Sequence, residues 1–173
     1  MMSQNMLLRF LAAFVFLGVL SCGPPTDGGH PSDASLLATF ENNRDDFERL
    51  LTMCEEDSGM IRIASDFTWK KDNVSWPRPQ SELGITNERW DTYRELFAKT
   101  QLRAGILNYQ PNAVVFSASS QGLLTAGSSK GYEYRRTPPD KVVDSLDSYK
   151  FEKAEKVYRH IEGNWYLYFE TTS

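Results

Sequence analysis

A serine flanked by glycines is the first group whose type and spacing could do chemistry. Residues 127–131 read Gly-Ser-Ser-Lys-Gly and match G-x-S-x-G, a pattern that sets a nucleophilic serine on a strand-to-helix turn. Aspartates and then His160 follow Ser129, in an order that a catalytic triad can use. The next residues, Gly-Tyr-Glu-Tyr-Arg-Arg, alternate like a strand instead of forming a helix. We therefore expect a Gly/Ser-rich connection between two strands, with Lys130 exposed, and place a Ser129–His160 hydrolase last among the possible functions.

The other patterns that could carry chemistry are incomplete. Residues 122–129 approach a phosphate-binding loop, but a serine stands where that loop needs the lysine that meets the phosphates. Cys54 lies on the apolar side of a predicted helix, where a buried and inert thiol is expected. With two histidines, two cysteines and a net charge of −4, the chain does not fit a zinc cluster, a multi-disulfide framework or a nucleic-acid binder driven by positive charge. We expect no catalytic residues, cofactor, metal or nucleic acid.

Aromatic and basic residues gather in a segment that has no regular pattern. Trp69 and Trp76 stand among cations in residues 65–85, which we predict to be a long surface loop. Exposed aromatics beside cations would suit a protein partner or a glycan, and a lid folded over the sheet edge is the alternative that we favour. The possible binding surface comprises Trp69, Lys70, Lys71, Trp76 and Arg78.

Two predicted helices and a series of strands must position these groups. Apolar residues recur with a helical period over 33–57 and 87–101, with Ser32 or Asp33 and Thr86 or Asn87 as the capping residues. Alternating segments at 60–64, 104–109, 113–119, 131–137, 157–161 and 165–170 predict strands. Gly163-Asn164 predicts a two-residue turn that pairs Ile161 with Tyr166. The fold class we expect is α+β, with two helices on one face of an antiparallel sheet of five or six strands.

The first residues of the chain read as a leader. Arg9 precedes the apolar run Phe10–Leu20, which has the length of a signal-peptide core and is too short to span a bilayer. The run ends in Val19-Leu20-Ser21-Cys22, which resembles the lipobox of bacterial lipoproteins. This resemblance implies that residues 1–21 are a signal peptide removed before Cys22, and that acyl chains on Cys22 hold the protein in a membrane. Because Gly23, and not an aspartate, follows Cys22, the family rule implies the outer membrane, facing the periplasm.

A short linker joins this anchor to the folded part. Residues 22–32 hold the cysteine and a Pro/Gly-rich stretch, which we expect to be an extended tether with His30 as a solvated spacer. Residues 33–173 then form a single globular domain. Its segments Gly127–Tyr132 and Trp165–Phe169 are loosely similar to those of bacterial lipoproteins of no known activity, so the resemblance transfers no site residues.

Three functions remain open at this point. The first is a membrane-anchored, non-enzymatic binding module that contacts an envelope protein or a glycan. The second is a periplasmic inhibitor or immunity-type protein, since a small acidic domain attracts basic enzymes. The third is the hydrolase that would use Ser129 and His160.

Overall fold

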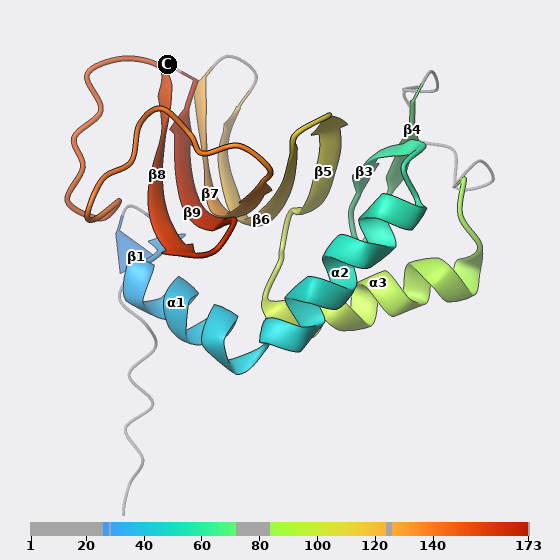
Figure 1. The fold of residues 1–173 in the computed structure, drawn as a ribbon. Coiled ribbons are helices and arrows are strands. Elements are labelled where there is room, and N and C mark those ends of the chain that lie inside the picture. Colours follow the sequence, from blue (N-terminus) through green and yellow to red (C-terminus); the bar gives the residue numbers. More distant parts are fainter. Residues whose placement is uncertain (1–25, 28, 72–83, 124–125, 173) are drawn as a thin grey trace, which may run out of the picture.

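The computed structural model describes residues 26–27, 29–71, 84–123 and 126–172, and these form three helices and two sheets (Figure 1). The helices are α1 (Asp33–Asn42), α2 (Arg44–Glu56) and α3 (Asn87–Thr100). Two-residue strands β1 (Thr26–Asp27) and β2 (His30–Pro31) pair with each other. The main sheet has seven antiparallel strands in the order β4-β3-β5-β6-β7-β9-β8. Their bounds are β3 Met60–Ile63, β4 Thr68–Lys70, β5 Gly105–Gln110, β6 Ala113–Leu123, β7 Ala126–Arg135, β8 Glu155–Glu162 and β9 Trp165–Thr171.

The predicted α+β class and antiparallel sheet are confirmed, while the number of elements differs. The helix expected over 33–57 is broken at Asn43, whose backbone leaves the helical region and whose side-chain amide donates to the Thr39 carbonyl at 2.8 Å. An asparagine that bonds the backbone in this way competes with the helix ladder. The segment 65–85, expected to be a loop, contributes the short strand β4. The caps expected at Ser32 and Thr86 are present, each side chain accepting a backbone N–H of the first turn.

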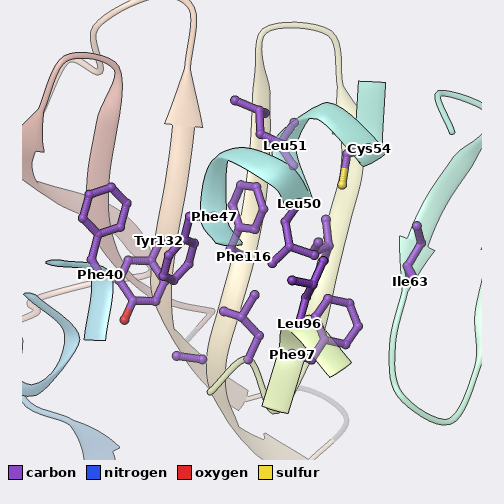
Figure 2. Packing of buried hydrophobic residues seen from close by; sticks show 14 of the residues in the cluster. Phe40, Phe47, Leu50, Leu51, Cys54, Ile63, Leu96, Phe97, Phe116 and Tyr132 are labelled. Atoms are coloured by element: carbon purple, nitrogen blue, oxygen red, sulfur yellow. The ribbon is translucent and has the colours of Figure 1, made fainter. Parts of the chain in front are cut away.

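The helices lie together on one side of the main sheet and supply half of the core (Figure 1). Phe47 of α2 is fully buried, with ring centroids 4.6 Å from Tyr132 and 6.2 Å from Phe116. Figure 2 shows Phe47 beside these two rings, with Leu50 and Cys54 further along the same helix. Aromatic pairs at these separations stabilise a core beyond the area that they bury. This layer fixes which strand face is covered by helices and which is not.

The β8–β9 hairpin has the predicted turn and a different register. Gly163, with φ of +47°, and Asn164 connect the paired residues Glu162 and Trp165. A bulge between His160 and Glu162 then pairs His160 with Tyr166, so the expected pairing of Ile161 with Tyr166 is wrong. A shift of one residue moves every following side chain to the other face.

The outer edge of β8 is covered at its centre by the chain that precedes the strand. Val142 forms a parallel bridge with Tyr158, whose N–H donates to the Lys141 carbonyl at 3.0 Å. The Val143 N–H in turn donates to the Tyr158 carbonyl at 2.7 Å. The Lys141 ammonium holds this chain in place by pairing with Glu155 at 2.5 Å. One edge of the sheet is thus occupied by the protein's own backbone.

Candidate functional site

The face of the sheet opposite the helices carries its own small cluster, made only of strand residues. Val115, Tyr158, Tyr166 and Tyr168 are buried there, with Leu107 packed against them. The register explains this grouping, because Tyr158 pairs with Tyr168 and His160 with Tyr166 across β8 and β9. Buried tyrosines on a face that no helix of the described residues packs against are unusual, since this face normally meets water.

A hollow with a volume of about 170 Å³ lies on this face, and we call it the serine hollow. Its lining has serine and tyrosine hydroxyls, charged side chains from strands on either side of the hollow, and two aliphatic residues. The lining residues are Arg62, Leu107, Val115, Ser117, Ser120, Ser129, Lys156, Tyr168 and Glu170. Strand alternation brings them together, because Ser117 and Ser129 project from neighbouring strands onto the face that also carries Tyr168.

Three hydroxyl groups of the serine hollow form one hydrogen-bonded chain. Ser129 Oγ lies 2.7 Å from the Tyr168 hydroxyl and 3.2 Å from Ser117 Oγ. Burial raises the pKa of Tyr168 to about 12, so its phenol stays protonated near neutral pH. A protonated phenol cannot take the Ser129 proton as a general base, which requires a pKa near the working pH. The chain of hydroxyls is therefore suited to hydrogen bonding.

Charged side chains border the serine hollow and are partly neutralised. The Lys156 ammonium lies 2.6 Å from the buried Glu133 carboxylate, 3.7 Å from Glu170, and 4.4 Å from the centroid of the Tyr168 ring. The Arg62 guanidinium donates to the Ala104 carbonyl at 3.0 Å. The border thus offers N–H donors and one half-exposed carboxylate, Glu170, as an acceptor.

The structure does not bring Ser129 and His160 together. Both project from the same face, but Ser129 pairs with Glu170 and His160 pairs with Tyr166. Tyr166 and Glu170 lie four residues apart on β9, about 13 Å along the strand. The His160 ring contacts the Gly163 carbonyl at 3.1 Å instead. Ser129 also lies within a strand and not on a strand-to-helix turn, so the geometry of a nucleophile elbow is absent at this serine.

The possible aromatic and basic surface is only partly described. Trp69 and Lys70 belong to the edge strand β4, and the Trp69 ring lies 5.1 Å from Phe67. Lys70 and Lys71 are exposed. Trp76 and Arg78 lie outside the described residues, as do Cys22 and the predicted leader. Cys54 is buried on α2 as expected, and burial raises the pKa of its thiol to about 12.

Two residues that were predicted to be exposed, Lys130 and His30, are buried. Lys130, expected to be exposed, has 1 % of its side chain accessible and pairs with Asp33 at 2.9 Å and Asp147 at 2.5 Å. His30, expected to be a solvated spacer, is 3 % exposed in strand β2, so the expected tether of residues 22–32 ends in part of the folded structure. Burial of an ion is tolerated when it is paired and hydrogen bonded, and the pairing with two aspartates provides this for Lys130.

The Asp33 carboxylate, on the first residue of α1, has three partners, and the backbone N–H of Asp33 has a fourth. It contacts Lys130, accepts the Leu146 N–H at 2.8 Å and meets Arg159 at 3.1 Å, while the Asp33 N–H donates to the Asp147 carboxylate. Burial acts to raise the pKa of Asp33, but the hydrogen bonds from Lys130 and Leu146 outweigh it and hold this pKa below its usual value. We call Asp33, Lys130, Asp147 and Arg159 the ion cluster.

Neither a metal site nor a membrane-spanning helix is found in the part of the chain that the structure describes. No group of three or more His, Cys, Asp or Glu side chains there is placed to hold a metal ion. Among the same residues, every helix is too short or too polar to cross a bilayer. Comparison with known proteins gives no family model, no curated protein and no solved structure that matches the chain.

Proposed function

We propose that this chain is a lipid-anchored, non-enzymatic binding domain of the cell envelope, and that the serine hollow takes one sugar unit of an envelope glycan. The observation that carries this proposal is the convergence of four hydroxyls, from Ser117, Ser120, Ser129 and Tyr168, on a face that no described helix packs against. Because hydroxyls both donate and accept hydrogen bonds, they complement the hydroxyls of a sugar in several orientations.

The size and the border of the hollow support a small, polar ligand. A volume of about 170 Å³ corresponds to roughly five or six water molecules, the scale of a single sugar ring. Lys156 and Arg62 add donors, and Glu170 adds an acceptor, which suits a ligand with many hydroxyls better than an apolar one. Ordered waters displaced from such a site are replaced by ligand hydroxyls that make equivalent hydrogen bonds.

The candidate nucleophiles and the candidate base make contacts that stabilise the fold or are buried, and this supports a binding role. Ser129 contacts a protonated tyrosine, His160 contacts a backbone carbonyl, and Cys54 is buried with a raised pKa. Each of them would have to lose a fold contact or its burial before acting as a nucleophile or a base.

The ligand is tested by co-sedimentation of the purified protein with insoluble envelope glycan, peptidoglycan first. We expect the Ser120→Tyr variant, which fills the hollow from its exposed border, to lose at least tenfold in affinity. The matched control is Ser148→Tyr, an exposed serine outside the hollow, which should bind as the wild type does. Equal binding by Ser120→Tyr and wild type, or no sedimentation of wild type with any envelope glycan, would remove the sugar assignment.

The anchor is tested separately, by fractionating cells that express the full chain. Several acyl chains bury dozens of CH₂ groups, at about 0.8 kcal/mol each, so anchoring by Cys22 should be effectively permanent. We expect Cys22→Ala to move the protein to the soluble fraction, while Cys54→Ala stays with the membrane. A Cys22→Ala protein that remains on washed membranes would show that something other than lipid holds it there.

A further inference from the structure

His30 is built into the sheet by both nitrogens of its ring. Nδ1 lies 2.7 Å from Ser119 Oγ on β6, and Nε2 lies 2.7 Å from Ser128 Oγ on β7. The edge of the ring meets Phe169 of β9, with centroids 5.1 Å apart. A ring with two short hydrogen bonds and 3 % exposure is docked, and it fixes the chain that leads to the predicted lipid anchor.

The two serines that hold His30 are each followed by a serine of the hollow. Ser119 and Ser128 face His30, whereas Ser120 and Ser129 line the serine hollow. Successive side chains on a strand point to opposite faces, so each Ser-Ser pair contributes one hydroxyl to His30 and one to the hollow. Ser120 and Ser129 are also direct neighbours in the β6–β7 ladder. The docked histidine therefore lies directly behind the hollow.

The backbone around His30 is shaped for this docking. Gly29 has φ of +91°, and an added Cβ would lie 2.3 Å from the side-chain nitrogen Nε2 of Gln121. Gly29 and Pro31 also line a cavity of about 100 Å³ between α1 and the sheet, together with Leu36, Ser119 and Tyr132. Undocking of this segment would open the cavity to water.

One charged group, Lys130, acts on His30, and the rest of the ion cluster reaches it from α1, β8 and the chain before β8. Lys130 on β7 is the cation whose charge acts on the ring, and it is paired with Asp33 of α1 and Asp147. Arg159 of β8 contacts Asp33. The ring's own partners on β6 and β7 are neutral hydroxyls, and its neighbour on β9 is Phe169. No carboxylate contacts the ring within the described residues, so a positive charge on His30 would lie beside Lys130 without direct compensation.

We propose that His30 and Pro31 form a releasable latch that docks the amino-terminal segment behind the serine hollow while His30 is neutral, and that protonation of His30 releases it. Release withdraws the ring from Ser119 and Ser128 and so loosens the two strands that carry Ser120 and Ser129. The latch would thereby make the support of the hollow sensitive to acid. The latch involves no ligand, and its release does not depend on what the hollow binds.

The direction of the pH effect follows from the environment of the ring. Burial, and then the charge of Lys130, lower the pKa of His30 from its ordinary value of 6.5. A lowered pKa means that the docked state holds the proton less tightly than the released state. Docking is therefore complete above pH 6.5 and weakens as the pH falls below it, by up to tenfold in the equilibrium constant per pH unit for one proton.

The test is hydrogen exchange of the full-length protein in detergent micelles between about pH 5 and 8, corrected for intrinsic exchange, with peptides over 26–34, 117–123 and 126–131. The chain has two histidines, so His160→Gln is the matched control. We expect protection of these peptides to fall by up to tenfold per pH unit below about 6.5 in wild type and in His160→Gln. His30→Gln, which cannot titrate in this range, should lose that dependence, and Gly29→Val should be unprotected at every pH.

Three outcomes decide the proposal. A His30→Gln variant that is unprotected at every pH also supports the latch, because it shows that the histidine ring holds the segment. Protection in wild type that does not change with pH overturns the latch. A pH dependence that persists in His30→Gln and disappears in His160→Gln overturns it as well.

Discussion

Replacing Lys130 with methionine removes the central cation of the ion cluster while filling most of its volume. The lysine side chain is 1 % exposed and Asp33 is 3 % exposed, so the change leaves a carboxylate that water cannot reach. Asp147 is 31 % exposed and recovers part of its hydration. Arg159 and the Leu146 N–H still contact Asp33, and this keeps the variant from losing all compensation of the charge.

The expected loss in the free energy of unfolding at pH 7 is about 3–5 kcal/mol, the cost of breaking a buried ion pair by removing one partner. For a domain of this size, roughly 3 °C per kcal/mol converts this to a decrease in Tm of about 9–15 °C. In wild type the pKa of Asp33 is held below 3.8, so its contribution to stability is present above that pH and is lost as the pH falls through the lowered value. Without Lys130 the pKa of Asp33 should rise, because burial then dominates. Acid should therefore reduce the difference between variant and wild type.

The assay is urea unfolding followed by tryptophan fluorescence, at pH 7 and at about pH 4, with the m value compared between proteins. The matched control is Lys99→Met, since the Lys99 side chain is 59 % exposed and its ammonium lies 3.9 Å from Asp46. This exposed pair should be worth less than about 1 kcal/mol. A loss below about 1 kcal/mol for Lys130→Met at pH 7, or a loss that does not shrink at pH 4, would refute the account of the ion cluster.

Three further predictions test the fold. Gly105→Ala should lower the free energy of unfolding by more than about 2 kcal/mol, because φ is +74° and the new Cβ would meet the Ile63 carbonyl oxygen at 2.2 Å. The control in the same urea assay is Gly59→Ala, whose new Cβ would have no neighbouring atom within 4 Å. Ser32→Ala should lower the free energy of unfolding by about 1 kcal/mol, because it removes the side chain that caps the Ser35 N–H. The control is Ser148→Ala, at an exposed serine outside the helices, which should leave the stability unchanged. Thermal melts compare the two variants, and equal Tm values would contradict the role of the cap. The Cys54 thiol should not react with Ellman's reagent at pH 8 in a Cys22→Ala protein until urea is added, because its pKa is raised to about 12 and it is 1 % exposed; rapid reaction of the folded protein would contradict its burial.

Local patterns predicted the class of the fold and several boundaries. The helical period, the capping residues Ser32 and Thr86 and the Gly163-Asn164 turn each depend on residues that are near one another in the chain. Asn43 could have been recognised as a break, since asparagine is a poor residue for a helix interior. The bulge beside Ile161 and the three-residue strand β4 have no such signal, because they depend on packing across the sheet.

The burial of Lys130 and His30 and the contact of Ser129 with Tyr168 were missed for a related reason. Lys130 was expected at the surface because its partner Asp33 is distant in sequence, and only the folded chain brings the two charges together. His30 follows a Pro/Gly-rich stretch, and composition alone predicts a solvated tether there. Ser129 was singled out by its motif, but its relation to Tyr168 depends on strand order. The one signal that was available is the repeated Ser-Ser pair, at 119–120 and 128–129, which alternation directs to two faces.

The backbone that covers the edge of β8 affects how neighbouring copies of the protein can pair on a membrane. Proteins anchored to a membrane, as proposed for this chain, meet one another in two dimensions at high local density, and an open strand edge is a template for pairing with a neighbour. Residues 141–143 already occupy the hydrogen-bonding groups of Tyr158 at the centre of the strand. At the opposite edge, β4 is only three residues long and includes exposed Lys70. Both edges of the sheet thus disfavour the growth of a continuous sheet between copies packed side by side on a bilayer.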